Sequence, residues 1–134
     1  MAHKPSLRPL EQAARLAALA SYSPYSQFPV GAAVLAESGK VYTGCNVENA
    51  SYGLCQCAER AAICTAISAG ERKIMAVAVY TPTRKPTTPC GACRQVINEF
   101  GPKARITCVC DTDKRIESAT PDLLPDAFGP ESLT

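Results

Sequence analysis

Apolar positions recur every three or four residues in the first part of the chain, which is the spacing of one helical face. Ser6 stands before this pattern, where an N-cap residue is expected. We therefore predict a helix from Ser6 to about Ala20. The positions that would share its buried face are Leu7, Leu10, Ala14 and Ala17.

After this helix the pattern changes to short apolar runs between turn-forming residues. Two runs, 30–36 and 40–45, flank a short turn that ends in Gly39. This arrangement predicts a β-hairpin with Gly39 at the tight position. The neighbouring segments 23–28 and 46–56 are polar or rich in turn formers, and we predict loops there.

Helical and strand patterns alternate in the rest of the chain. Cys57 to Ala69 is predicted to be a helix, because its apolar residues share a face and Gly70 follows as a stop signal. Residues 74–80 are almost all apolar, which is typical of a strand covered on both faces. The remaining predicted elements are a loop at 81–89, a helix at 91–100 and a strand at 105–110. Residues 111–120 are polar and predict no element.

This order of elements predicts an α/β fold in which helices cover both faces of a sheet, a three-layer α/β/α sandwich. The chain has 134 residues, of which 46% are hydrophobic, so it is long enough for one real core. No internal repeat or linker divides it. We therefore expect a single domain, 1–134.

Composition excludes several classes of protein. The formal net charge is +2 and the basic residues are scattered, so neither points to a nucleic-acid surface. No apolar run reaches the ~20 residues that cross a bilayer. Glu11 and Arg15 interrupt the N-terminal apolar segment, which fails as a signal peptide, so we expect a cytoplasmic protein. In a cytoplasmic protein, the eight cysteines predict metal binding or buried free thiols.

The candidate chemistry lies in Cys57, Glu59, Cys90 and Cys93. Both cysteine segments begin predicted helices, whose free N–H groups and partial positive charge stabilise thiolates. Three thiolates suit zinc, and three protein ligands with a position left for water are typical of a catalytic site. The only histidine, His3, lies outside these motifs. Glu59 would take a proton from the water, which indicates a hydrolase.

Arg60 is expected to offset the charge of the three thiolates by donating hydrogen bonds to sulfur. Two alternatives remain open for the same cysteines. Cys90 and Cys93 alone could form a redox pair, or Cys55 could close a structural zinc site as a fourth ligand. The other cysteines are predicted to be small core residues; they are Cys45, Cys64, Cys108 and Cys110.

Further motifs accompany the metal motif in a fixed order: 23–33, 44–53, 89–95 and 123–129. Together with Cys57-Ala-Glu59 they resemble the small, homotetrameric, zinc-dependent cytidine deaminases over about Leu10 to Pro130. The resemblance implies a mixed sheet of about five strands with an N-terminal β-hairpin. It also implies one Zn²⁺ per subunit and pockets shared between the subunits of a homotetramer.

The resemblance implies hydrolysis of cytidine and 2′-deoxycytidine to uridine and 2′-deoxyuridine with release of ammonia, a step of pyrimidine salvage. It assigns Asn46 and Glu48 to the ribose hydroxyls and Phe28 to the sugar and base. It assigns the Ala58 N–H to the pyrimidine carbonyl and proton transfer to Glu59. The positions that it draws from neighbouring subunits are Ala50, Tyr52 and Phe128.

Other functions remain as alternatives. The enzyme could act on a modified cytidine or another aminopyrimidine nucleoside. A zinc-stabilised interaction module without catalysis belongs to a different class. A polynucleotide deaminase would need a basic, aromatic-lined channel, and the small net charge and the absence of tryptophan argue against it. We accordingly expect a small nucleoside as the partner, and neither nucleic acid nor a membrane.

Overall fold

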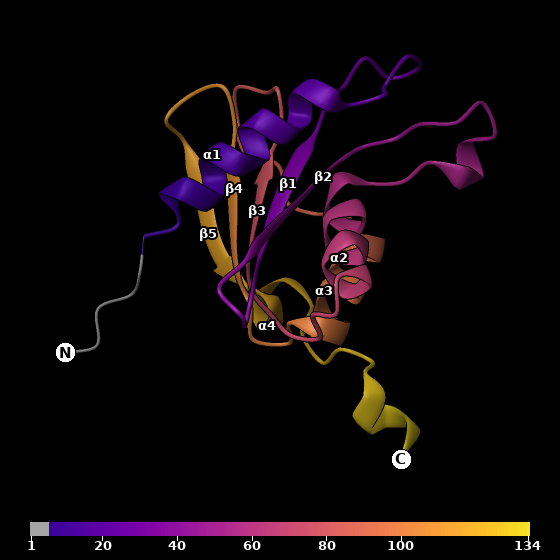
Figure 1. The fold of residues 1–134 in the computed structure, drawn as a ribbon, viewed down its shortest axis with the longest axis vertical. Helices are drawn as coiled ribbons and strands as arrows, with labels where there is room; N and C mark the ends of the chain where they lie inside the picture. The colour runs from indigo at the N-terminus through magenta and orange to yellow at the C-terminus, as the bar shows by residue number, and fades with distance from the viewer. Residues whose placement is uncertain (1–5) are drawn as a thin grey trace.

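The protein folds into one mixed sheet with helices on both faces (Figure 1). The computed structural model describes residues 6–134, so His3 lies outside the described residues. Along the chain the elements are α1 (Arg8–Ala17), a 3₁₀ turn (Ala18–Ala20), β1 (Gly31–Ala36), β2 (Val41–Cys45), a 3₁₀ turn (Tyr52–Leu54), α2 (Ala58–Ser68), β3 (Ile74–Tyr80), α3 (Gly91–Phe100), β4 (Arg105–Val109), β5 (Arg115–Ala119), α4 (Thr120–Leu123) and a 3₁₀ turn (Pro130–Leu133).

The strands lie in the order β2-β1-β3-β4-β5. β3 and β4 run parallel, whereas every other neighbouring pair in this sheet is antiparallel. β1 and β2 follow one another directly, and Gly39 in the turn between them has φ +90°, a conformation that glycine adopts without strain. The expected mixed α/β sheet of about five strands is therefore confirmed.

β3 divides the interior into two layers because its side chains alternate between the faces of the sheet. Ala76 and Ala78 pack with α1, where Leu10 and Ala14 are buried. The other face is larger and holds α2 and α3. Its buried residues include Val77, Val79, Ala62, Ile63 and Ile97. These two cores on opposite faces make the predicted three-layer sandwich.

The register of the sheet sets the position of the site. Gly31 pairs with Cys45 of β2 on one side and with Tyr80 of β3 on the other. The carboxyl ends of β2 and β3 therefore lie at the same end of the sheet. The segment after β2 leads to the first residue of α2, and the segment after β3 leads to the first residue of α3. Two helix N-termini thus meet near one edge.

Some local expectations need correction. α1 begins at Arg8 with Leu7 at the N-cap position, although Ser6 Oγ still accepts a hydrogen bond of 3.2 Å from the Arg8 N–H. β5 forms where no element was predicted. It is an edge strand in which Ile116 packs on the core while its neighbours are more exposed, so its apolar signal is weak. Within residues 6–134 no helix is long and apolar enough to span a membrane.

The predicted core cysteines divide into two groups. Cys108 and Cys110 are buried, and burial raises the pKa of Cys108 to about 12. Cys45 is only half-buried. The prediction was wrong for Cys64, which is exposed because it lies with Thr65 on the solvent side of α2.

Candidate active site

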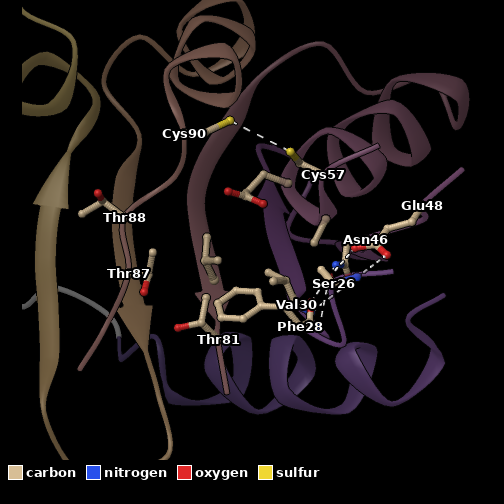
Figure 2. Close-up of a pocket in the computed structure, with 13 residues that line it drawn as sticks. Ser26, Phe28, Val30, Asn46, Glu48, Cys57, Thr81, Thr87, Thr88 and Cys90 are labelled. Atoms are coloured by element: carbon tan, nitrogen blue, oxygen red, sulfur yellow. Dashed lines mark hydrogen bonds between the residues drawn. The ribbon is translucent and has the colours of Figure 1, made fainter. Parts of the chain in front are cut away.

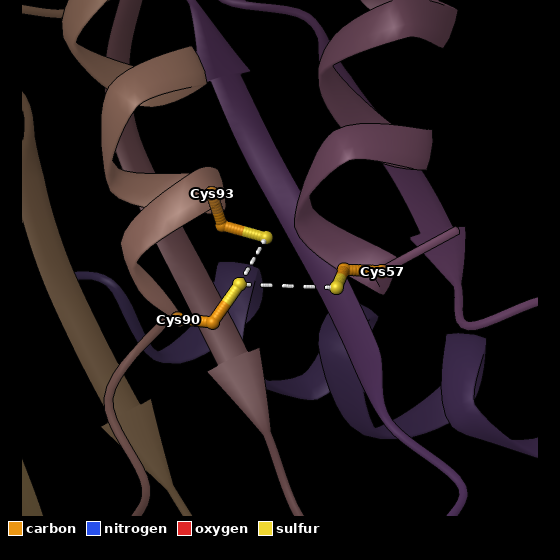
Figure 3. Close-up of side chains that lie close together, drawn as sticks. All are labelled: Cys57, Cys90 and Cys93. Atoms are coloured by element: carbon orange, nitrogen blue, oxygen red, sulfur yellow. Dashed lines mark hydrogen bonds between the residues drawn. The ribbon is translucent and has the colours of Figure 1, made fainter. Parts of the chain in front are cut away.

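Two helix starts from separate parts of the chain bring three sulfur atoms together (Figure 3). Cys57 is the N-cap residue of α2, Cys90 is the N-cap residue of α3, and Cys93 lies in the first turn of α3. The three Sγ atoms all lie within 4.8 Å of one another. Cys57 Sγ is 4.0 Å from Cys90 Sγ, which is 3.4 Å from Cys93 Sγ.

This sulfur cluster has the dimensions of a zinc site. Zinc–sulfur bonds of ~2.3 Å around a tetrahedral ion place neighbouring sulfurs roughly 3.8 Å apart. The separations of 4.0 and 3.4 Å lie on either side of that value. Cys55 is not part of the cluster, because its Sγ instead contacts the backbone N–H of Asn49 at 3.4 Å. Three sulfur ligands leave the fourth tetrahedral position to a water molecule.

Arg60 provides positive charge beside the sulfurs. Its Nη2 lies 3.7 Å from Cys57 Sγ and 3.3 Å from the carbonyl oxygen of Cys55. A hydrogen bond from Cys93, together with Arg60, lowers the pKa of Cys57 to about 5. The same hydrogen bond and burial raise the pKa of Cys93. The lowered pKa favours the thiolate of Cys57, and thiolate is the form that binds metal.

Glu59 is a buried carboxyl group beside the sulfur cluster. It is the second residue of α2, and only 5% of its surface is exposed. Its pKa is raised, chiefly by burial and further by the negative charge of Cys57. A carboxyl group in such a position can accept a proton and return it, which is general acid–base chemistry.

The sulfur cluster opens into a cavity of about 510 Å³ (Figure 2). This volume lies in the range of small-molecule sites. The residues of the sequence hypothesis that line it are Phe28, Asn46, Glu48, Cys57, Ala58, Glu59 and Cys90. Cys93 is fully buried beneath the cavity wall. Segments that are far apart along the chain therefore form one pocket that combines the sulfur cluster, a buried carboxyl group and polar side chains.

Asn46 and Glu48 also hold the loops that surround this cavity. Asn46 Oδ1 accepts hydrogen bonds from the Ser21 hydroxyl and from the Val30 N–H at 2.9 Å, and Nδ2 donates to Phe28 O at 2.8 Å. Glu48 Oε1 accepts from the backbone N–H groups of residues 25 and 26 at 3.0 and 3.1 Å. Glu48 Oε2 accepts from the hydroxyl of residue 26, and this bond is the main cause of a lowered pKa at Glu48.

Three residues of the sequence hypothesis lie outside this cavity. Ala50 and Tyr52 are exposed on the loop between β2 and α2, and 71% of the Tyr52 surface is accessible. Phe128 lies near the C-terminus with 60% of its surface exposed, while its carbonyl oxygen accepts a 2.8 Å hydrogen bond from Gln95 Nε2. One chain alone does not bring these three residues to the cavity.

Sequence reasoning missed one wall of the cavity. The residues of this wall are Val79, Thr81, Thr87 and Thr88. They lie at the end of β3 and in the segment before Cys90, which the sequence had marked only as a loop. Their position could have been found from topology, because ligand sites of α/β sheets lie beyond the carboxyl ends of strands.

Comparisons with known proteins agree with this geometry. Residues 6–110 match the family model described as the cytidine and deoxycytidylate deaminase zinc-binding region. A cytidine deaminase from Sporosarcina psychrophila is 49% identical over 115 residues, which are 85% of this chain and 85% of that protein. A similar protein from Halalkalibacterium halodurans, also named cytidine deaminase, is 46% identical over 84% of this chain and 86% of its own length.

Solved structures show the same relationship. The crystal structure of cytidine deaminase from Burkholderia pseudomallei superimposes with a TM-score of 0.89 at 47% identity, covering 92% of this chain and 100% of the other. That of cytidine deaminase from Mycobacterium tuberculosis gives a TM-score of 0.81 at 42% identity, covering 94% and 99%. By the match to the family model, the identity to these relatives and the shared fold, the chain belongs to the zinc-binding cytidine and deoxycytidylate deaminase family.

Proposed function

We propose that this protein hydrolyses cytidine and 2′-deoxycytidine to uridine and 2′-deoxyuridine and releases ammonia. The observation that carries the proposal is one cavity in which the cluster of Cys57, Cys90 and Cys93 adjoins the buried Glu59 and the polar pair Asn46 and Glu48. Relatives that share most of the chain are named cytidine deaminase. The cavity therefore supplies groups for both the reacting amine and the sugar.

The chemical step needs an activated water and a group that moves protons. A zinc ion held by the three sulfurs would act as a Lewis acid and lower the pKa of a coordinated water. Glu59 accepts the proton of the attacking water and delivers it to ring N3, which makes C4 more electrophilic. Glu59 then takes the proton of the hydroxyl group now on C4 and passes it to the amine, so that the C4–N4 bond breaks, ammonia leaves and the C4 carbonyl of the product forms. Burial of Glu59 keeps bulk water from competing for these protons.

The base is oriented by the start of α2. Ala58 is the first residue of this helix, and the first N–H groups of a helix have no partner within it. The Ala58 N–H is thus free to bind the pyrimidine carbonyl, next to the Glu59 side chain that serves N3. Phe28 lines the same cavity and provides an apolar surface for the sugar and base.

Asn46 and Glu48 bind the sugar through the hydrogen-bonding groups that their contacts with the loops leave free. Asn46 Nδ2 uses one of its two N–H groups on Phe28 O, so one remains. Glu48 Oε2 accepts one hydrogen bond and keeps further capacity as an acceptor. One donor and one acceptor suit a single hydroxyl group that accepts from the amide and donates to the carboxylate.

We further propose that the active form is a homotetramer in which neighbouring subunits complete each pocket. The support is the exposure of Ala50, Tyr52 and Phe128 outside the cavity of their own chain. Tyr52 and Phe128 are large side chains that a single chain leaves exposed, and contact with a neighbouring subunit would cover them. Light scattering of the active enzyme tests this proposal, and a fully active monomer would contradict it.

The function is tested by following the absorbance change of deamination with cytidine, 2′-deoxycytidine, cytosine and adenosine, with and without a chelator. We expect turnover of the two cytidine nucleosides that stops when zinc is removed and returns when it is added back. Turnover confined to a modified cytidine would favour the alternative substrate class instead. A protein that binds zinc yet deaminates none of these compounds would contradict the proposal.

A further inference from the structure

Thr87 and Thr88 form the part of this wall that stands across the cavity from Asn46 and Glu48 (Figure 2). It belongs to the segment that joins β3 to Cys90, whereas the opposite side is built from the start of α2 and the loop before it. The mechanism proposed above assigns no task to these two threonines. Hydroxyl groups on the wall of a cavity that is otherwise largely apolar are candidates for recognition.

The geometry of a pyrimidine nucleoside decides which part of the substrate faces this wall. This step rests on the proposed function. C4 must reach the sulfur cluster and Glu59, while the sugar on N1 reaches Asn46 and Glu48. The N3 and C2-carbonyl edge then faces Glu59 and the N–H of Ala58. The edge that carries C5 and C6 is the one left to face Thr87 and Thr88.

Thr88 holds the wall in place. Its Oγ1 accepts a 2.8 Å hydrogen bond from Arg94 Nη2. Arg94 also donates from Nε to Pro89 O at 2.8 Å and from Nη1 to Leu123 O at 2.9 Å. Arg94 therefore ties residues 88–89 to the chain at the end of α4, so the wall is a rigid part of the cavity.

Thr87 differs from the other two threonines of the wall, Thr81 and Thr88, because its hydroxyl group is free. Thr81 is buried, and its Oγ1 lies 2.9 Å from Thr83 Oγ1, so that hydroxyl is already engaged. Thr87 is exposed, and its hydroxyl has no hydrogen-bond partner among residues 6–134. A free hydroxyl can both donate and accept, so it can bind a polar group brought by the substrate.

We propose that Thr87 is a specificity-determining residue whose hydroxyl binds a small polar substituent at C5 of the base. The chemical class is a cytidine nucleoside with a hydrogen-bonding group at that position, such as 5-hydroxymethylcytidine. Its deamination consumes one water, breaks the C4–N4 bond and releases ammonia, as for cytidine itself. 5-Methylcytidine has nearly the same shape without the hydroxyl group and is the matched comparison.

The test is the ratio of kcat/KM for 5-hydroxymethylcytidine to kcat/KM for 5-methylcytidine in the zinc-loaded enzyme. Thr87→Val keeps the shape of the side chain and removes the hydroxyl, so we expect this ratio to fall about fivefold, the factor of one neutral hydrogen bond. Thr87→Ser keeps the hydroxyl and should retain the ratio. The intrinsic reactivity of each base is the same in every variant. A change in the ratio of kcat/KM values therefore reports the contact between residue 87 and the substituent at C5.

Thr65→Val is the control, since Thr65 is exposed on α2 and its hydroxyl bonds only to Ala61 O. It should leave the ratio unchanged. An unchanged ratio in an active Thr87→Val enzyme would overturn the inference and leave the proposed function intact. A wild-type enzyme that deaminates no cytidine would overturn the proposed function, and this inference with it.

Discussion

Gly44 of β2 and Ala58 of α2 approach so closely that no side chain fits between them. A β-carbon on Gly44 would stand 2.7 Å from the carbonyl oxygen of Ala58 and 2.8 Å from the Ala61 side chain. It would also collide with the backbone nitrogen of Ala62. The missing side chain lets the first turns of α2 rest directly on β2. This contact positions Cys57, the proposed metal ligand at the start of α2, and Glu59, the proposed acid–base residue.

Gly44→Ala should therefore damage both stability and activity. The added carbon must push the start of α2 away from the sheet, because it meets two backbone atoms and the β-carbon of Ala61, none of which can rotate aside. We expect a loss of about 1–3 kcal/mol in the free energy of unfolding, the usual cost of overpacking. Denaturant unfolding measures it. Gly53→Ala is the control, since a β-carbon there meets nothing within 4 Å, and equal stability of the two variants would contradict the argument.

Cys93→Ala should abolish stoichiometric zinc binding. Cys93 is fully buried and contributes one of three sulfurs, so two ligands would remain to hold the ion. Metal analysis of the purified variant measures the effect, and activity should be lost with the metal. Cys64→Ala removes an exposed thiol far from any predicted ligand role and should keep its zinc. One zinc per chain in Cys93→Ala would exclude the assigned ligand set.

Glu59→Gln should keep zinc and lose at least ~100-fold in kcat, the lower end of acid–base contributions. Glutamine preserves the volume of this buried side chain but can neither accept the proton from water nor deliver it to N3. Steady-state kinetics together with metal analysis separate this effect from loss of the ion. Glu117→Gln, at an exposed position of β5, serves as the control. Turnover close to that of the wild type would remove Glu59 from the mechanism.

Ser26→Ala should shift the acid limit of substrate binding. The hydroxyl of Ser26 is the largest cause of the lowered pKa of Glu48, so its removal raises that pKa towards the ordinary 4.5. The Glu48 carboxylate stays charged until the pH falls through its own pKa, which is lower in the wild type than in Ser26→Ala. The KM for cytidine should therefore begin to rise at a higher pH in Ser26→Ala than in the wild type. Ser38→Ala, which removes a similar hydrogen bond to Glu71, should not move this limit.

Much of the fold and of the metal cluster could be predicted because their signals are local. The apolar run 74–80 coincides with β3, and the cysteines at two predicted helix starts lie together as expected. The residue pattern did not predict β5, because this edge strand packs one partly buried apolar side chain, Ile116, on the core between exposed neighbours. The residue pattern marked Thr87 only as a loop residue, and its place at the site follows from the topology, because it lies between the carboxyl end of β3 and the start of α3.

Removal of single sugar hydroxyls should distinguish two very similar nucleosides. Asn46 and Glu48 retain one donor and one acceptor, enough for one hydroxyl. Both proposed substrates share the hydroxyl groups at C3′ and C5′, and we expect the pair to bind the one at C3′, which is attached directly to the sugar ring. We expect kcat/KM for 2′-deoxycytidine to lie near that for cytidine and that for 3′-deoxycytidine to be at least ~10-fold lower, because its loss leaves both polar groups unpaired. Asn46→Ala should reduce the difference in kcat/KM between 2′-deoxycytidine and 3′-deoxycytidine. Equal turnover of both deoxynucleosides by the wild type would show that the pair serves only to hold the loops.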